Sequence, residues 1–541
     1  MQEKDLDLRI TKIGCLPIID LIIEKMGLKS KLVQALSNEA YAEALMILLK
    51  NILMNREAIY AVKDWAQLHG LRLSDEAEIN DDRIGRALER LFQIDRATLQ
   101  TEIVLGVVKK FDLKMDQIHS DTTSITVSGH YANQDKLGVQ LKRGHSKDHR
   151  PDLKQLVYNL CVSRDGAIPI HFKCYDGNRS DDSIQLETWN SLRVLLQRPE
   201  FIYVADSKLC VEETMRKIDS EHGQFVTIVP RTRKETDDFA NSLEQGEVRW
   251  EKCLRRKSSR YKSEFDTFEV ATGFYQLREG FKVYWYRSSQ KQKRDYVSRK
   301  ERIARAEEKL ESLDLKRLRG PKTETAMRNR VDAILLRFKA KDWLQVEIKT
   351  DIDEEFKALS RGKPTGETRY KKIIKKAPRL HIKRNVEAIA KAQLMDGIFP
   401  LATNTKMNAL EVLNSYKYQP HLEKRHAFLK STLNVAPVWL KKNVRIEALM
   451  FVEYLAQMVA SLIERELRGS MEQKKLPVLF SLPEGRASKT PTFEQLTRLF
   501  ENRDRNELFD KDRLVKLFRQ PLTPVQSQIL GLLKIEESVY A

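Results

Sequence analysis

Cysteines, tryptophans and glycine-rich phosphate-binding loops are scarce in this chain, and each scarcity argues against a class of protein. The five cysteines among 541 residues are far apart and show no paired spacing, which argues against a zinc ribbon or a disulfide framework. Gly-x-Gly-x-x-Gly and Gly-Lys-Ser/Thr motifs are absent, which argues against an ATPase. The six tryptophans are scattered, which is more typical of core positions than of a surface that stacks bases.

Long hydrophobic runs and secretory signals are missing as well. The N-terminus reads MQEKDLDLRI and has neither a positive start nor an apolar core, so we expect no export. The most apolar segment, 448–463, carries Glu453 and is too short to span a bilayer comfortably. We interpret it as a buried helix, and we expect a cytoplasmic protein without membrane contact.

Positive charge, in contrast, is abundant. The chain has 96 Lys and Arg against 77 Asp and Glu, a net charge of +19, which favours an anionic partner such as nucleic acid. Residues 281–390 alone hold 31 basic and 16 acidic residues, a surplus of 15. We expect this cluster, including KKIIKK at 371–376, to contact a nucleic-acid backbone. The long charged helix expected at 291–318 is better explained by itself as a solvated, salt-bridged surface.

The pattern of apolar residues predicts an α+β protein with several domains. Apolar positions recur at helical spacing near the N-terminus, and from residue 117 short β-rich segments begin, two of which form a hairpin at 154–163 and 168–175. Helices and further strands up to residue 229 complete the order β-β-β-α-β-α-β, which predicts a mixed sheet with flanking helices. The expected regions are 1–112 (helical), 113–232 (core, first part), 233–392 (basic insertion), 393–435 (core, second part) and 436–541 (helical).

Two aspartates occupy positions that suit a metal ligand. Asp121 interrupts the first predicted strand and is therefore rigidly placed, and Asp206 directly follows the strand at 201–205. In open α/β sheets the carboxyl ends of strands are where ligands bind. Each aspartate also has a local explanation, because Asp121 can bond with Thr122 or Thr123 and Asp206 can cap the next helix.

A third acidic residue, Glu423, belongs to a spaced motif with Tyr416, Gln419 and Lys430. On one continuous helix these residues would fall within an arc of about 60°. Pro420 favours the first turn of a helix, so Tyr416 can lie ahead of the helix while Glu423 and Lys430 share a face. The spacing arises by chance about 0.4 times in a chain of this composition, so the motif alone is weak evidence for a metal site. The evidence is stronger because the motif follows two candidate carboxylates in the chain.

In this order the residues resemble the DDE transposases of bacterial insertion sequences. After Asp121, Asp206 and a long insertion comes a motif similar to Tyr-x2-Arg-x3-Glu-x6-Lys, which marks one subgroup. The segment 144–154, GHSKDHRPDLK, also resembles one branch of that subgroup. The chain departs from the pattern at Gln419, where the subgroup usually has Arg, because a neutral amide cannot form a bidentate ionic pair with a phosphate.

The resemblance implies a fold, a reaction and partners. The fold would be a ribonuclease H-like core interrupted by a largely β insertion. The activity would be Mg²⁺-dependent cleavage at transposon ends and strand transfer, carried out by a bacterial, DNA-associated protein that binds terminal inverted repeats and target DNA as a homodimer. The implied roles are catalysis and binding of two Mg²⁺ ions, or Mn²⁺ in their place, by Asp121, Asp206 and Glu423, and DNA contact by Tyr416, Gln419 and Lys430.

Two other functions and one other metal site stay open on the sequence. A ribonuclease H-like nuclease without strand transfer would use the same carboxylates, and a non-catalytic DNA-binding protein derived from a transposase would keep only the basic surface. His145 and His149 have the spacing of metal ligands on a helix, but their basic, proline-containing context favours a loop or a phosphate contact.

Overall fold

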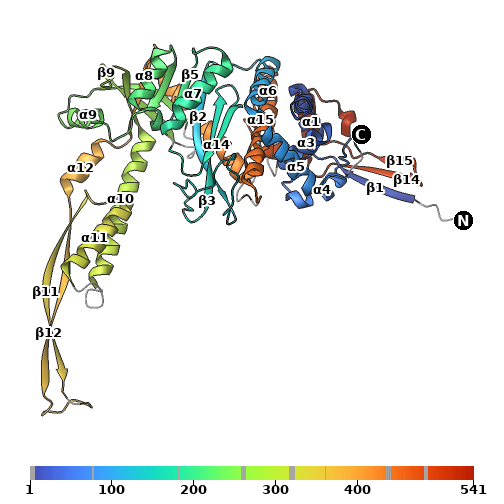
Figure 1. Cartoon of the computed structure of the whole chain (residues 1–541). Helices are drawn as coiled ribbons and strands as arrows, with labels where there is room; N and C mark the ends of the chain where they lie inside the picture. The colour runs from blue at the N-terminus through green and yellow to red at the C-terminus, as the bar shows by residue number, and fades with distance from the viewer. Residues whose placement is uncertain are drawn as a thin grey trace. The chain divides into compact units, whose positions relative to one another are not determined.

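The computed structural model describes residues 6–540 except 76–77, 181, 258–263, 316–322, 360, 434, 436–437, 439 and 480–484. The chain is an α+β protein with a mixed sheet, as the sequence predicts, and it divides into two units (Figure 1). The first unit comprises 1–227, 403–406 and 411–541, and the second comprises 228–402 and 407–410. The predicted insertion, 233–392, lies within the second unit, and all six predicted site residues lie in the first.

Strands of a mixed sheet organise the first unit. These strands are β2 (Gln117–Val127), β3 (Lys154–Ser163), β4 (Pro169–Asp176), β5 (Ile202–Ala205) and β6 (Gln224–Ile228). They lie in the order β4-β3-β2-β5-β6, in which β2, β3 and β4 are antiparallel neighbours and β5 and β6 run parallel to β2. Helices α7 (Asp182–Leu196) and α8 (Glu212–Ser220) make the crossovers. The predicted hairpin is confirmed, with Gly166 at φ 78° in its turn.

Helix α15 (Asn443–Gln473) forms the core of the first unit beside this sheet (Figure 1). It is the one helix of the described residues that is long and apolar enough to cross a membrane, and 94% of its apolar window is buried inside the protein. The prediction of a buried helix at 448–463 is therefore confirmed. The helices that pack on α15 are α1 (Leu16–Met26), α3 (Glu39–Met54), α5 (Asp81–Gln93), α16 (Phe493–Phe500) and α17 (Pro524–Leu533).

The sequence predicts helical terminal regions, but the structure also contains strands there. Strand β1 (Leu6–Lys12) pairs antiparallel with β14 (Asp504–Asp510), and β14 pairs with β15 (Arg513–Phe518). In β1 apolar and polar residues alternate, which is the pattern of a strand with one apolar face. The remaining helices of the N-terminal region are α2 (Leu28–Leu36), α4 (Val62–Leu68) and α6 (Arg96–Phe111).

The second unit combines strands with long helices, so it is not the largely β insertion that the resemblance implies. Its strands are β7 (Trp250–Lys257), β8 (Phe265–Ala271), β9 (Tyr275–Gln276), β10 (Lys282–Ser288), β11 (Leu344–Ala358), β12 (Tyr370–Arg384) and β13 (Ile398–Thr403). Its helices are α9 (Lys234–Glu244), α10 (Ser289–Leu315), α11 (Glu324–Phe338) and α12 (Val386–Leu394). Helix α10 accounts for most of the charged helix predicted at 291–318, whose last residues lie outside the described ones.

The long hairpin of β11 and β12 is held at its base by α10 and α11 (Figure 1). Leu310 of α10, Val331 of α11 and Leu344 of β11 belong to one buried apolar cluster. Lys371 and Lys372, from the predicted basic run, are exposed on β12. The hairpin therefore offers positive charge to solvent beyond its packed base.

Candidate catalytic site

Asp121 and Asp206 lie at the same level on neighbouring parallel strands. Strands β2 and β5 are in register at His119 and Val204, and each aspartate comes two residues later in its own strand direction. Neighbouring strands are about 4.8 Å apart, and residues two apart point to the same face of a sheet. The sheet therefore brings these two predicted ligands side by side where β5 ends.

Glu423 approaches from helix α14 (Gln419–Ala427), which packs on β2. The side chain of Gln419 at the start of the helix bonds to the ring of His119 at 2.7 Å, and its Nε2 donates to the carbonyl of Ser120 at 3.1 Å. Glu423 lies one turn after Gln419, on the same side of the helix. Since Asp121 follows His119 on the same face of β2, the helix carries Glu423 toward the level of Asp121.

The pKa of the Tyr416 phenol is affected by the charges of all three candidate carboxylates. Burial raises the pKa of Tyr416, and the charges of Asp206, Glu423 and Asp121 raise it further. All three acidic groups thus act on one hydroxyl, although Asp121 and Glu423 are 302 residues apart in the chain. The structure brings these four predicted residues into one neighbourhood.

The aspartates also make the local contacts that the sequence left open. The carboxylate of Asp121 accepts a hydrogen bond from the backbone of Thr122 at 2.8 Å. Asp206 caps a short 3₁₀ turn and accepts from the backbone of Lys208 at 3.1 Å. One carboxylate can accept several contacts at once, so these bonds are compatible with a ligand role.

The motif from Tyr416 to Lys430 does not form one continuous α-helix. Tyr416 ends helix α13 (Ala409–Tyr416), and α14 begins at Gln419 with Pro420 in its first turn, as the proline suggests. Lys430 lies in a π-helical turn (Phe428–Thr432), which changes the angular spacing between Glu423 and Lys430. The shared stripe expected from α-helical spacing is therefore replaced by three short consecutive elements.

Gln419 is 8% exposed, and its amide is bound within the protein by His119 and Ser120. Burial lowers the pKa of His119 to about 4, so its ring is neutral and can donate from one nitrogen to Gln419. This arrangement favours an anchoring role for Gln419 over the DNA contact that the resemblance implies.

Lys147, His426 and Asp148 were not assigned a role from the sequence, and the first two lie close to Asp121. Lys147 Nζ lies 3.7 Å from one carboxylate oxygen of Asp121, and His426 Nε2 lies 3.9 Å from the other. Lys430 Nζ pairs with Asp148 at 2.6 Å. Lys147 and Asp148 belong to the segment 144–154, whose likeness to one transposase branch was the available signal, while nothing in the sequence distinguishes His426.

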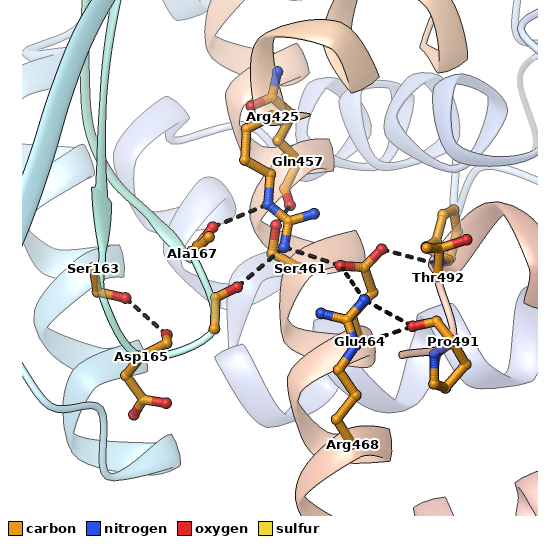
Figure 2. Close-up of polar contacts among 12 residues, drawn as sticks. Ser163, Asp165, Ala167, Arg425, Gln457, Ser461, Glu464, Arg468, Pro491 and Thr492 are labelled. Carbon is orange, nitrogen blue, oxygen red and sulfur yellow. Dashed lines mark hydrogen bonds and ion pairs between the residues drawn. The ribbon is translucent and has the colours of Figure 1, made fainter. Parts of the chain in front are cut away.

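A network of ion pairs and hydrogen bonds anchors α14 through Arg425, two residues after Glu423 in the chain (Figure 2). Arg425 donates from Nε to the carbonyl of Ala167 at 3.0 Å and pairs with Glu464 of α15 at 3.0 Å. Glu464 also pairs with Arg468 at 3.3 Å, and Arg468 donates to the carbonyl of Pro491 at 2.8 Å. The helix that carries Glu423 is thereby tied to both the β3–β4 turn and the core helix.

The donor set suits a hard divalent cation, because Asp121, Asp206 and Glu423 offer only carboxylate oxygens. Within the described ranges, however, no three His, Cys, Asp or Glu side chains are already gathered closely enough to hold a metal ion. His145 and His149 lie in a loop and form no such group there. The three carboxylates lie near one another, but they do not form a preformed metal-binding site.

Comparisons with known proteins give little beyond this geometry. No family model and no curated protein matches the chain. Among solved structures, the chain is similar to a piggyBac transposase in a synaptic complex with hairpin DNA, at 11% sequence identity and a TM-score of 0.26. The match covers 49% of this chain and 60% of that one, so the chain spans less than two thirds of its length. A TM-score this low carries no argument about fold or function.

Proposed function

We propose that this chain is a DDE transposase, which cleaves DNA at transposon ends and transfers the cleaved strand into target DNA. The observation that carries the proposal is the register of β2 and β5, which places Asp121 and Asp206 side by side. Glu423 supports it, because its charge acts on the same Tyr416 phenol as theirs. The antiparallel β2, β3 and β4 followed by two crossover strands support a ribonuclease H-like core.

Asp121, Asp206 and Glu423 would hold two Mg²⁺ ions, or Mn²⁺ in their place. Such ions, when bound, lower the pKa of a water molecule and stabilise the oxygen that leaves phosphorus. The protein's own part is to place the ligands. Asp121 pairs with Leu160 of β3 and lies two residues beyond the pairing of β2 with β5, and Glu423 lies between Gln419 and Arg425, both of which are buried and hydrogen-bonded.

The proposed reaction has two steps, hydrolysis of one phosphodiester and then exchange of one phosphoester bond for another. A water oxygen attacks the scissile phosphate, the bond from phosphorus to the 3′ oxygen breaks, and that oxygen leaves as a 3′-hydroxyl. The same site then accepts this hydroxyl as the attacking group on a target phosphate, where a new phosphoester bond forms while the target's bond from phosphorus to its own 3′ oxygen breaks and that oxygen leaves as a 3′-hydroxyl. Tyr416 offers a hydroxyl near the carboxylates and Lys430 offers a cation that is paired with Asp148, and both would contact phosphates of the transposon end.

Duplex DNA would also bind the second unit. Within 281–390 the surplus of 15 positive charges includes exposed lysines on β12, such as Lys371 and Lys372. Contacts of this kind depend on charge rather than on base sequence, because phosphates carry no sequence information. Two protomers would pair two transposon ends, with the N-terminal helices contacting the terminal inverted repeats.

The test uses the full-length protein, Mg²⁺ and linear DNA that carries the sequences flanking its own gene. Joined products support transposition, and cleavage without joining would identify a nuclease. We expect Asp121→Asn, Asp206→Asn and Glu423→Gln each to lower both activities by at least about 100-fold, since each removes a metal ligand. Wild-type protein that binds this DNA but never cuts it would instead identify a non-catalytic binding protein.

The matched control is Glu213→Gln, which removes an exposed carboxylate from α8 of the same unit. It should leave cleavage and joining unchanged. If it lowers both activities as much as Asp121→Asn does, the loss reflects net charge and the assignment of the site is wrong.

A further inference from the structure

The segment 144–154, for which the proposed mechanism has no role, folds against β2 beside the candidate ligands. The backbone amide of Lys147 donates to Ser124 Oγ at 2.9 Å, and its Nζ donates to the carbonyl and the hydroxyl of Thr122 at 2.5 and 2.8 Å. Strand β2 pairs with β5 from Gln117 to His119, and Thr122 and Ser124 lie farther along β2. Lys147 is thus held at this end of β2.

The start of the segment is anchored by close backbone packing. A Cβ at Gly144 would lie 2.1 Å from the carbonyl oxygen of Gly177, so only glycine fits there. Gln155 Nε2 donates to the same Gly177 carbonyl at 2.9 Å and to the carbonyl of His145 at 3.3 Å. The position of Lys147 is therefore set from both its own contacts and the packing that precedes it.

Asp121 and Asp148 are each paired with a lysine. The ammonium of Lys147 lies 3.7 Å from the carboxylate of Asp121, and that of Lys430 lies 2.6 Å from the carboxylate of Asp148. His426 Nε2 lies 3.9 Å from the carboxylate of Asp121, slightly farther than the ammonium of Lys147. Lys147 is therefore the cation nearest to Asp121 among the residues whose ion pairs are described.

We propose that Lys147 is the counter-ion of Asp121 in the metal-free protein and becomes a phosphate ligand once a divalent ion takes its place. The carboxylate of Asp121 cannot interact at full strength with a nearby ammonium and with a divalent cation at the same time, because the two cations repel each other. Displaced from Asp121, the ammonium of Lys147 remains next to the site where DNA phosphate must lie. This inference rests on the proposed function and adds a second phosphate-binding cation beside Lys430.

The proposal makes opposite predictions for metal affinity and for catalysis. Removing the ammonium with Lys147→Met should tighten Mn²⁺ binding to the DNA-free protein by about fivefold, because a competing ion pair is lost. The same variant should slow DNA cleavage at saturating Mn²⁺ by about tenfold or more, because a charged hydrogen bond to phosphate is lost. Lys147→Arg should keep both properties near those of the wild type.

The experiment measures Mn²⁺ binding by isothermal titration calorimetry on the full chain without DNA, and cleavage separately. Arg150→Met is the matched control, since Arg150 lies in the same segment but pairs with Asp152 at 2.7 Å, and it should change neither property. Unchanged or weaker Mn²⁺ binding in Lys147→Met, or equal effects of Arg150→Met, would overturn the inference.

A further variant separates failure of this inference from failure of the proposed function. Asp121→Ala should abolish Mn²⁺ binding at the site. If it leaves Mn²⁺ binding intact, the metal site itself is wrong and the proposed function fails with it. If it abolishes binding while Lys147→Met has no effect on affinity, only the role of Lys147 is wrong.

Discussion

Arg425 and Glu464 form an ion pair 3.0 Å apart with 8% and 6% of their side chains exposed, and this pair joins the helix that carries Glu423 to the core helix. Glu464 is shared with Arg468 and also accepts from the backbone of Phe493 at 3.0 Å. Removing one member of such a buried set leaves charge without a partner. The network therefore couples the stability of the fold to the position of a proposed metal ligand.

Arg425→Met should lower the free energy of unfolding by about 3 kcal/mol, since it leaves Glu464 short of a buried partner. Arg498→Met is a matched control, because Arg498 pairs with Glu494 on the surface, and it should cost less than about 1 kcal/mol. Urea denaturation measures both. Similar losses in the two variants would contradict a special role for the buried pair.

Gln419 and Lys430 should differ in what they support, although the resemblance assigns DNA contact to both. Gln419→Ala should cost about 2 kcal/mol of stability, because His119 and the Ser120 carbonyl lose a buried partner. The affinity of the Gln419→Ala variant for DNA should stay within about twofold of the wild type when it is measured by fluorescence anisotropy in a buffer that contains Ca²⁺. Lys430→Met should show the reverse, with weaker DNA binding and a stability loss below about 1 kcal/mol from its partly exposed pair with Asp148. A large loss of DNA affinity in Gln419→Ala would restore the contact that the resemblance implies.

The basic hairpin of the second unit should contribute to the salt dependence of DNA binding. Each phosphate contact adds about 0.9 to the slope of log affinity against log salt concentration, so Lys371→Ala should reduce that slope by about one unit. Lys29→Ala, which removes a lysine paired with Glu43 at 2.7 Å in the first unit, serves as the control and should leave the slope unchanged. Equal slopes for the wild type and Lys371→Ala would show that Lys371 does not contact a DNA phosphate.

Stability should fall as the pH drops below about 6.5, because several histidines are buried in the neutral form. Burial lowers the pKa of His171 to about 4, so between pH 6.5 and 4 the unfolded chain binds a proton that the folded chain excludes. That difference favours unfolding by about 2 kcal/mol at pH 5. His171→Gln should therefore lose about 2 kcal/mol less than the wild type between pH 7 and pH 5 in urea denaturation. An identical loss would show that His171 is protonated in the folded protein.

Local patterns predicted the strands and helices of the first unit's sheet well. The hairpin of β3 and β4 combines a nearly continuous apolar run in β3 with a second short β-rich segment after a turn at Gly166, so its signal lies within about two dozen residues. Strand β1 was missed even though it alternates, because its partner β14 lies nearly 500 residues away and each strand is short. A short amphipathic segment has no preference for sheet until a partner is present.

Residue types and their spacing alone determined the candidate ligands, the basic insertion and the buried helix at 448–463, because charge, hydrophobicity and periodicity are properties of the chain itself. The tertiary structure decided which of these groups meet. The register of β2 with β5 sets Asp121 beside Asp206, the break after Tyr416 turns Gln419 inward, and the packing of 144–154 brings Lys147 to Asp121. Such contacts join segments separated by tens to hundreds of residues, and their geometry arises only when strands pair and helices pack.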